Sequence, residues 1–426
     1  MKFAEALAEL ESRQPERMIP DLDRITTLAR VLGDPQLTYP TIHVTGTNGK
    51  TTTSRLVSDL ACAHGLTTGL YTSPHLESVT ERIAICGEPI PETDFTAEYE
   101  HLLPFLREVD VMGERVTYFE VLTALAFLSF ADAPVGLGVF EVGMGGKWDA
   151  TNVVAGDVAV ICPIALDHPE LGATLQEKAI EKAAIIKEGK IAVSREQPEV
   201  VREIIEARAA EVGARLLVED VDFQWEDRQP AVGGQVLTVR TPHGRYDELL
   251  LTVYGEHAAR NAAAAIVAVE GLLDRPLDDD AVRETFASAA SPGRLEILAR
   301  QPLVILDGAH NPAGAAALAE ALEEAFTWER LLLVLAVSAD KDLEGIVAPF
   351  ETLATEAFVT RYAGARAYAP QVLAAACRDA GLPAVAFDSV EEALAAAAAN
   401  ASEADAILVT GSLYTVADAR RILTKP

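Results

Sequence analysis

The sequence predicts an α/β fold in two domains, and two features of its pattern support this assignment. Short apolar runs rich in valine, isoleucine and leucine alternate with helical segments along almost the whole chain. Continuous apolar runs of this kind are typical of parallel strands covered on both faces, so the alternation predicts doubly wound, mostly parallel sheets. The length of 426 residues is too great for one typical domain and suits two or three.

The elements follow from these runs in order. The expected strands are residues 41–45, 136–142, 158–162, 303–307, 330–337 and 406–410. The expected helices are roughly residues 50–64, 116–130, 174–188, 257–273, 312–326 and 389–400. Residues 218–255 are rich in strand and turn patterns, which predicts a β-hairpin insert. Small residues and a Pro-Gly pair precede the strand at Leu303, so we expect one domain at 1–293 and a smaller Rossmann-like α/β domain at 297–426.

Composition excludes several classes of protein. No apolar run approaches the ~20 residues that span a bilayer, and the acidic N-terminus lacks the apolar core of a signal peptide. We therefore expect a soluble, cytoplasmic protein. Lys and Arg number 35 against 65 Asp and Glu, and the net charge of −30 repels nucleic acid and anionic membranes. An acidic, lysine-poor surface would suit a cytoplasm at high salt, where screening removes self-repulsion.

The four cysteines carry no recognisable pattern. Cys62, Cys86, Cys162 and Cys377 are scattered, none pairs at zinc-ligand spacing, and four in so long a chain form no disulfide framework. We expect reduced cysteines, partly in the core.

The stretch TIHVTGTNGKTTTSRL, residues 41–56, predicts a strand, a glycine turn and a helix. It departs from the usual G-x-x-x-x-G-K-[ST] loop because Val44 occupies the first glycine position, and the nearest glycine is Gly46. Converging backbone N–H groups, a lysine and a hydroxyl can hold phosphates and a magnesium shell. The candidates are Gly46, Thr47, Asn48, Gly49, Lys50, Thr51 and Thr52. An ordinary tight turn is the alternative. If the segment is a nucleotide-binding loop, the first domain is expected to be of the P-loop ATPase type.

Polar residues also follow other predicted strands of the first domain. A carboxylate at the carboxyl end of a strand, such as Glu141, is where the magnesium of a nucleotide site is held. Ser73 and His168 occupy similar strand-end positions, although a turn residue and a structural histidine are the plain alternatives. Lys178, Glu181 and Lys182 share one helix, and their spacing by itself predicts a solvated face with Glu/Lys pairs.

The chain's later part repeats this pattern. Asn261 opens an apolar helical stripe, and Arg294 lies at the expected hinge. Asp307, His310 and Ser412 follow strands of the second domain. Arg294, Asp307 and His310 could close over a nucleotide bound by the first domain, and Ser412 could touch a second substrate. Helix capping or packing is the alternative for each of them.

Taken together, these motifs resemble the Mur ligase superfamily, and within it the dihydrofolate synthase/folylpolyglutamate synthase family. The segments that carry the resemblance, in matching order, are GTNGK, TSPHL, DATN, LDH, EKA, PGRLE, DGAHNP and GSLY. They extend over nearly the whole chain, from Gly46 to Arg420. The resemblance implies a central-type ATP-binding domain followed by a C-terminal glutamate ligase domain.

The resemblance also implies an activity and its residues. The reaction would be ATP-dependent addition of L-glutamate to dihydropteroate, to reduced folylpolyglutamates or to both, through an acyl phosphate. Two Mg²⁺ ions, a carbamylated Lys182 and a monomer are expected. The implied catalytic residues are Lys50, Lys182 and His168; the ATP-binding residues are Gly46–Thr52 as given above, Asn261, Arg294, Asp307 and His310; the metal-binding residues are Ser73, Glu141, His168 and Thr52; and the substrate-binding residues are Phe119, Asp149 and Ser412.

Some positions depart from the family pattern, and other functions remain open. Thr51 stands where the folate family usually has glycine, Lys147 and Trp148 replace Arg-Leu, and Ala184 replaces glycine. One alternative is another Mur-type amino-acid ligase that acts on cell-wall precursors. Those enzymes normally carry an extra N-terminal substrate domain, for which the ~40 residues before the loop leave no room. A nucleotide-binding switch without ligase activity is the other alternative.

Overall fold

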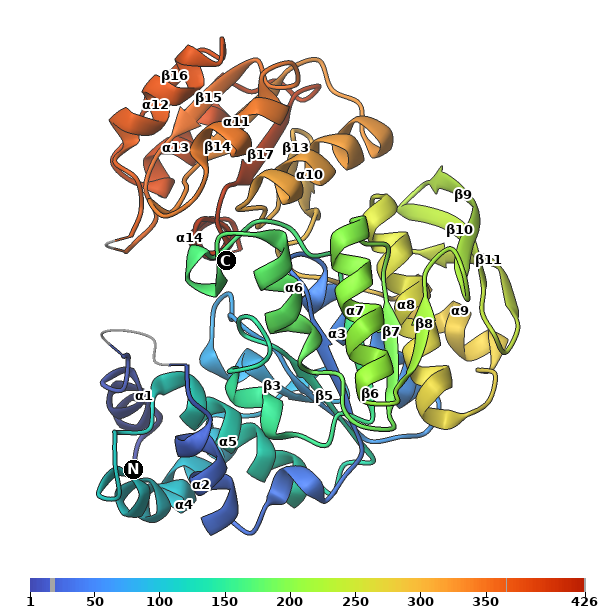
Figure 1. Cartoon of the computed structure of the whole chain (residues 1–426). Helices are drawn as coiled ribbons and strands as arrows, with labels where there is room; N and C mark the ends of the chain where they lie inside the picture. Colours follow the sequence, from blue (N-terminus) through green and yellow to red (C-terminus); the bar gives the residue numbers. More distant parts are fainter. Residues whose placement is uncertain (16–19, 365, 425–426) are drawn as a thin grey trace. The chain divides into compact units, whose positions relative to one another are not determined.

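The computed structural model describes residues 1–15, 20–364 and 366–424, which form two compact units (Figure 1). Unit 1 comprises Met1–Asp227, Leu237–Leu249 and Arg260–Ser288. Unit 2 comprises Arg228–Val236, Leu250–Ala259 and Ala289–Pro426. The division at Ser288 lies close to the expected boundary at 293–297, and unit 2 also takes two short segments from the strand-rich region before it.

Unit 1 is built around a sheet of eight strands in the order β4-β3-β2-β5-β1-β6-β7-β8. Five successive pairs from β2 to β8 are parallel, and β3 and β4 extend the sheet in antiparallel fashion. The strands are β1 Thr41–Thr45, β2 Thr68–Tyr71, β3 Ile83–Ile85, β4 Glu88–Pro89, β5 Leu137–Glu141, β6 Val158–Ile161, β7 Ile191–Ser194 and β8 Arg215–Val218.

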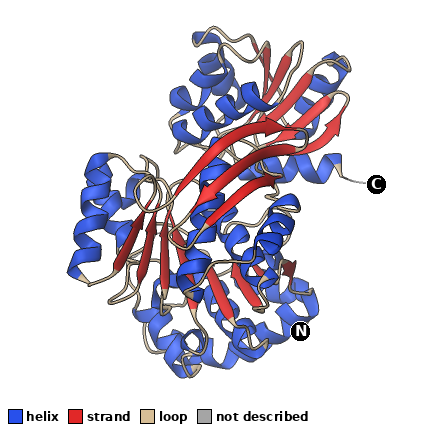
Figure 2. Ribbon diagram, turned by 90° about the vertical axis from the view of Figure 1, so that its right-hand side faces the viewer, coloured by secondary structure: helices blue, strands red, loops and turns tan. Residues whose placement is uncertain are grey.

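Helices flank the sheet strands, which Figure 2 shows in red between blue helices. The α-helices up to the boundary are α1 Phe3–Glu11, α2 Asp23–Val31, α3 Lys50–Ala63, α4 Glu92–Asp110, α5 Tyr118–Asp132, α6 Leu175–Ala183, α7 Glu199–Glu211, α8 Glu256–Leu273 and α9 Asp279–Ala287. Short 3₁₀ helices are η1 Pro35–Leu37, η2 Val79–Arg82, η3 Ala150–Val153 and η4 Pro169–Leu171.

Aromatic residues fill the largest core of unit 1. Phe127 and Phe130 of α5 pack on Phe140 of β5, with ring centres 5.4 and 5.5 Å apart. These rings, with Phe95 and Tyr99 of α4, have no exposed surface. The helix α5 is buried nearly all round, which explains its almost uniformly apolar sequence. This core holds one side of β5 and thereby fixes the strand that ends in the carboxylate described below.

Unit 2 contains a six-stranded sheet in the order β12-β13-β17-β14-β15-β16. Its strands are β12 Glu296–Arg300, β13 Leu303–Leu306, β14 Leu331–Leu335, β15 Glu356–Val359, β16 Ala384–Ala386 and β17 Ala406–Thr410. Its helices are α10 Pro312–Ala325, α11 Leu343–Val347, η5 Ala348–Phe350, α12 Pro370–Asp379, α13 Val390–Asn400 and α14 Leu413–Leu423. All pairs except β12 with β13 are parallel, so the predicted α/β class is confirmed for both units.

The strand-rich region forms more than the predicted hairpin. Three strands, β9 Gln224–Ala231, β10 Gly234–Arg240 and β11 Arg245–Leu251, make a separate sheet in the order β11-β10-β9. The other predicted elements agree with the structure to within a few residues. The largest difference is the helix predicted at 174–188, which ends at Ala183 because a turn containing Gly189 leads into β7. Among the described residues, no helix is both long and apolar enough to cross a membrane.

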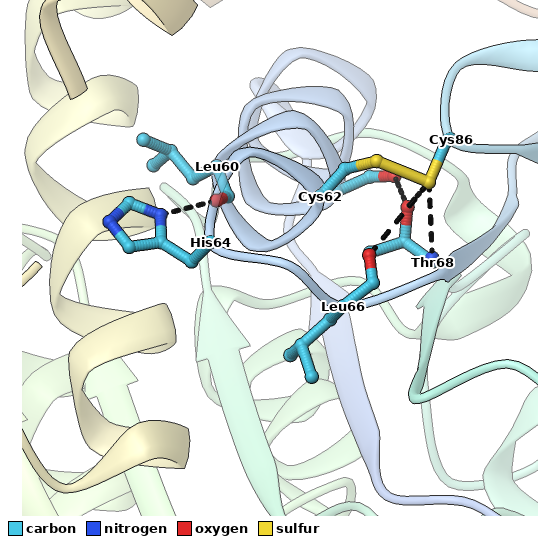
Figure 3. The surroundings of a disulfide bond; sticks show 7 residues. Leu60, Cys62, His64, Leu66, Thr68 and Cys86 are labelled. Carbon is cyan, nitrogen blue, oxygen red and sulfur yellow. Dashed lines mark hydrogen bonds between the residues drawn. A yellow bond between two sulfur atoms is a disulfide. The ribbon is translucent and has the colours of Figure 1, made fainter. Parts of the chain in front are cut away.

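One cysteine pair is joined, which makes the expectation of reduced cysteines wrong for two of the four. A disulfide links Cys62 of α3 to Cys86, in the turn after β3 (Figure 3). The antiparallel pairing of β2 with β3 places Gly69 opposite Ile85 and so carries Cys86 back toward α3, with 5.9 Å between the two cysteine Cα atoms. Cys162 and Cys377 are free and buried, as expected.

Candidate functional site

Four neighbouring strands of unit 1 bring the predicted first-domain motifs to one edge of the sheet. The strands β2, β5, β1 and β6 are adjacent and parallel, so their carboxyl ends lie side by side. In register, Val44 of β1 is opposite Glu141 of β5, and Thr45 is opposite Ile161 of β6. Ligands of open α/β sheets bind in the crevice beyond these strand ends.

The glycine turn between β1 and α3 has the geometry that a short phosphate loop needs. Gly49 has φ of 88°, in the left-handed region that favours glycine. A Cβ atom at this position would lie only 2.8 Å from Oδ1 of Asn261, so the close approach also requires glycine. The Lys50 ammonium donates to the carbonyl oxygens of Gly46 at 3.0 Å and Thr47 at 3.3 Å. The lysine therefore lies over its own loop, at the N-terminus of a 14-residue helix that favours anions.

Glu141 connects two of the sequence motifs. Its side chain is buried, with one carboxylate oxygen accepting from the Thr51 hydroxyl at 2.8 Å and the other from the Ser73 N–H at 3.2 Å. Thr52, the other hydroxyl candidate, is buried on the same turn of α3. Carboxylate and hydroxyl oxygens are hard ligands of the kind Mg²⁺ prefers, so this donor set fits a magnesium ion.

Two lysines of α6 are buried, so the solvated face predicted from their spacing is wrong for both. The Lys182 ammonium donates to the Gly46 carbonyl at 2.9 Å, although the two residues are far apart in sequence. Burial, together with the charge of Lys50, lowers the pKa of Lys182 to about 7. Lys178 donates to the carbonyl oxygens of Asp167, His168 and Gly172 and so shapes the loop after β6.

His168 occupies that loop with φ of 53°, an uncommon backbone angle for a residue other than glycine. Its Nε2 lies 3.6 Å from an Asp167 carboxylate oxygen, and its Nδ1 lies 3.8 Å from an oxygen of Glu170. The side chain is about one third exposed. Its assignment to a metal or to catalysis stays a prediction.

The two substrate candidates of unit 1 border the glycine loop after β5. Phe119 packs 5.9 Å from the ring of Tyr71, and a Cβ atom added to Gly143 would lie 2.5 Å from the Phe119 ring. Asp149 is buried and accepts from the N–H of Met144 and from the N–H and hydroxyl of Thr151. Burial raises the pKa of Asp149. Its hydrogen bonds hold the loop 143–151, and a contact with substrate stays a prediction.

Asn261 lies against Gly49 of the phosphate loop and bonds to Arg195, a residue that the sequence reasoning missed. Its Oδ1 accepts from Nη1 of Arg195, and Arg195 also pairs with Glu219 at 2.9 Å. All three side chains are buried. Arg195 directly follows β7, so the rule that singled out other strand-end residues could have found it. His75 and Arg82, also outside the predicted set, lie on the segment after β2.

Unit 2 places its candidates at the adjacent ends of β13 and β17. The Asp307 N–H donates to the Val409 carbonyl, and Gly411 N–H donates to the Ala309 carbonyl, which joins the two strand-end loops. Asp307 is buried, and its carboxylate accepts from the N–H groups of Leu295 and Ala309 at 2.9 and 2.7 Å. Burial raises the pKa of Asp307, and Arg294 opposes this.

The remaining candidates of unit 2 also contact nearby backbone. His310 Nδ1 lies 2.8 Å from the Gly308 carbonyl oxygen. Ser412 is the N-cap of α14 and accepts from the Tyr414 N–H at 3.2 Å. A Cβ atom at Gly308 would come within 2.6 Å of Arg294 Nη1, so this guanidinium packs directly on the loop.

Comparisons with known proteins agree with this arrangement. Residues 44–269 match the Mur ligase middle domain, and residues 293–413 match the Mur ligase glutamate ligase domain. The chain is 42% identical to a dihydrofolate synthase/folylpolyglutamate synthase of Mycobacterium tuberculosis, over 97% of this chain and 92% of that protein.

Solved structures give the same result. A Mycobacterium tuberculosis folylpolyglutamate synthase complexed with ADP has a TM-score of 0.95 and 40% identity, covering 100% of this chain and 98% of that one. An FPGS–AMPPCP–folate complex has a TM-score of 0.89 and 32% identity, with full coverage of both chains.

Proposed function

Because this chain belongs to the dihydrofolate synthase/folylpolyglutamate synthase family of Mur ligases, we propose that it is an ATP-dependent ligase that joins L-glutamate to dihydropteroate, to reduced folylpolyglutamates, or to both. One structural observation carries most of the proposal. The phosphate loop, the carboxylate of Glu141 and the amine of Lys182 meet at one edge of the unit 1 sheet. Relatives of the same length bind ADP, or AMPPCP with folate, which supports nucleotide and folate as substrates.

The chemistry explains why these residue types are needed. A carboxylate is a poor acyl donor, so its oxygen first attacks the γ-phosphorus of ATP, giving an acyl phosphate and ADP. The amine of glutamate then attacks the acyl carbon, and phosphate leaves with the carbon–oxygen bonding pair. Lys50 and the N–H groups at the start of α3 would offset the charge on the transferring phosphoryl group.

Magnesium would be held by the oxygen ligands around Glu141. We assign Glu141, Ser73, Thr52 and His168 to two Mg²⁺ ions, as the family resemblance implies. Bound magnesium supplies Lewis-acid stabilisation of phosphoryl oxygens. Thr51 takes part through its hydrogen bond to Glu141, which orients the carboxylate.

Lys182 is proposed to be carbamylated in the active enzyme. A neutral amine is the form that reacts with carbon dioxide, and a pKa of about 7 leaves a large neutral fraction at physiological pH. The ammonium first loses one proton; the neutral amine then adds to carbon dioxide, which forms an N–C bond, moves one C=O electron pair onto oxygen and releases a second proton, so that a cation becomes an anion. This anion would suit a site that holds magnesium and the phosphate chain better than an ammonium would.

The other candidates receive roles by the same resemblance. We propose that Asn261, Arg294, Asp307 and His310 contact the nucleotide, that Phe119 and Asp149 contact the pterin side of the substrate, and that Ser412 contacts glutamate. A cytoplasmic monomer and two domains at 1–293 and 297–426 stay predictions.

A product assay tests the proposed function. The full chain is incubated with ATP, Mg²⁺ and L-glutamate, with dihydropteroate and tetrahydrofolate offered in parallel reactions, and products are identified by mass. We expect ADP release and a product heavier by one glutamyl residue in at least one reaction. Reactions without glutamate are the control. If no combination of a pterin substrate with glutamate gives ADP, the chain is not this ligase. A nucleotide-binding switch without ligase activity would then be the better interpretation.

A further inference from the structure

Arg82 is a buried arginine that has no carboxylate partner among the described residues. The described residues include three buried arginines, Arg13, Arg82 and Arg195. Arg13 pairs with Glu9 and Asp110, and Arg195 pairs with Glu219. Within the described part of the chain, no carboxylate oxygen comes within salt-bridge distance of Arg82, which is 8% exposed. A buried charge is costly unless it is paired, so this guanidinium is suited to an anion that arrives from outside.

The direct partner of Arg82 is His75. The Nε–H of Arg82 donates to Nδ1 of His75 at 2.9 Å. Because an arginine Nε always carries its hydrogen, Nδ1 must accept, and the second histidine nitrogen, Nε2, is then the protonated one. The two side chains together therefore offer donors only: the two Nη groups of Arg82 and the Nε2–H of His75. A pair of this kind matches a carboxylate, which only accepts.

The pair lies on the segment that leads away from the catalytic edge of the sheet. His75 follows Ser73 by two residues, and the Ser73 N–H donates to Glu141. Arg82 ends η2, and the same segment then enters β3. The donor pair is thus connected through a short stretch of backbone to the carboxylate beside the phosphate loop.

An aromatic ring contacts the donor pair, and two more follow close to it in the fold. The Arg82 guanidinium carbon is 5.6 Å from the centre of the Tyr118 ring. The next residue, Phe119, packs on Tyr71 and against Gly143. A ligand that combines a flat ring with a carboxylate fits this arrangement, because the ring can lie against an aromatic side chain while the carboxylate meets the donors. The phosphates of ATP have a separate set of donors, in the loop after β1.

We propose that Arg82 and His75 bind a carboxylate of the pterin-bearing acyl substrate and so contribute to its selection. The inference rests on the proposed function and deepens it. It also explains why the fold keeps a buried cation that no carboxylate of the described residues pairs with: the substrate completes the ion pair. Arg82 is then a binding residue, and its cost to the free protein is offset only in the complex.

The test separates binding from folding. In the full chain, Arg82→Gln and Arg82→Leu should raise KM for the acyl substrate about 10- to 100-fold, the effect of losing a hydrogen bond to a charged group. KM for ATP should change less than about twofold, because the phosphate loop is intact. Arg82→Lys keeps the positive charge but loses the planar guanidinium with its paired N–H donors. Its KM for the acyl substrate should lie between those of the wild type and Arg82→Leu. Urea unfolding without substrates should show Arg82→Leu to be at least as stable as the wild type.

Arg13→Leu is the matched control, because it removes a buried arginine whose carboxylate partners stay behind. It should lower the urea midpoint clearly. The inference is overturned if Arg82→Leu destabilises the chain as much as Arg13→Leu and leaves the acyl-substrate KM unchanged. A parallel rise in KM for ATP would also overturn it, since the anion would then be the nucleotide. If the wild type makes no glutamylated product, the proposed function fails. If the wild type makes the product but the Arg82 variants keep the wild-type KM for the acyl substrate, only the inference about Arg82 and His75 fails.

Discussion

The two strand-end regions differ in how their polar side chains are satisfied. In unit 1, Lys182 reaches the Gly46 carbonyl, and Glu141 accepts from Thr51 and Ser73, so side chains link segments far apart in sequence. In unit 2, the Asp307 carboxylate accepts from nearby N–H groups, and Ser412 caps the helix that it precedes. The first region keeps several buried charges near one another, whereas the second uses its polar atoms to hold its own loops.

This difference predicts different consequences of mutation. A buried ammonium such as Lys182 costs stability in the free protein, so its removal should harm activity more than folding. The polar groups of unit 2 satisfy buried backbone N–H groups, and their removal should harm folding as well. The following experiments test this contrast, from the largest expected effect to the smallest.

Lys182→Ala should lower the ligase rate about 10²- to 10³-fold, the usual cost of removing one preorganised charged group from an active site. A short carboxylic acid should restore part of the rate if the functional group is an anion formed on this lysine. Glutamylated product measured by mass gives the readout. Lys190→Ala, a half-exposed lysine of the same unit paired with Asp157, should stay within about twofold of the wild type. Full activity of Lys182→Ala would contradict the proposed catalytic role of Lys182. It would also contradict the contrast drawn between the strand-end regions of unit 1 and unit 2.

The lowered pKa of Lys182 also predicts how stability changes with pH. Between pH about 7 and the ordinary lysine value of about 10.4, the unfolded chain binds one more proton than the folded chain. The unfolding free energy should therefore rise with pH over this window. Below pH about 7, the folded protein should carry the full free-energy cost of the buried ammonium. Lys182→Met removes that cost, so its gain over the wild type should be larger at pH 6 than at pH 10. Urea unfolding in buffers free of carbon dioxide measures this, and a gain independent of pH would count against it.

The disulfide should stabilise unit 1 alone. Cys62 and Cys86 are 24 residues apart, and a loop of this size is worth about 2–4 kcal/mol in unfolding free energy. Reduction should therefore speed hydrogen exchange in α3 and β3 and leave the unit 2 strands unchanged. A Cys62→Ser, Cys86→Ser variant is the control and should not respond to the reductant. Labelling of four thiols before reduction would show that the bond is absent.

Asp307→Ala should lower unfolding free energy by about 1–3 kcal/mol, because two buried N–H groups lose their acceptor. Hydrogen exchange should locate the loss in unit 2. Asp340→Ala, at an exposed carboxylate of the same unit, should change stability by less than about 0.5 kcal/mol. Equal effects of the two substitutions would remove the distinction drawn between the units.

The acidic composition predicts the smallest effect, a rise in thermal stability with KCl. Screening of a net charge of −30 should raise Tm by about 2–4 °C between low and molar salt, the shift that about 1 kcal/mol gives in a domain of this size. Calorimetry at several KCl concentrations measures it, with sucrose as a neutral control. Unchanged stability at low salt would reject the idea of adaptation to a salty cytoplasm.

Local pattern was enough to predict most elements of this fold. The strand at 41–45 and the helix that begins at Lys50 follow from apolar runs, a glycine turn and periodicity, all of which act over a few residues. The Gly46–Lys50 loop and Glu141 could be chosen as candidates because strand ends are where α/β sheets bind ligands. The family resemblance added the roles, and the matching domains confirm the family.

Contacts between segments far apart in the chain could not be predicted from the sequence. Spacing predicted a solvated face for Lys178 and Lys182, but both side chains are buried and donate to the loop after β6 and to the Gly46 carbonyl. The Cys62–Cys86 bond depends on the antiparallel turn of β3, which no cysteine spacing reveals. That Arg82 has no carboxylate partner among the described residues depends on which side chains the fold places around it. Sequence by itself determined the elements and the chemical groups available, because those are local properties; tertiary structure decided which charges are buried and which are paired, because burial and pairing depend on residues that only folding brings together.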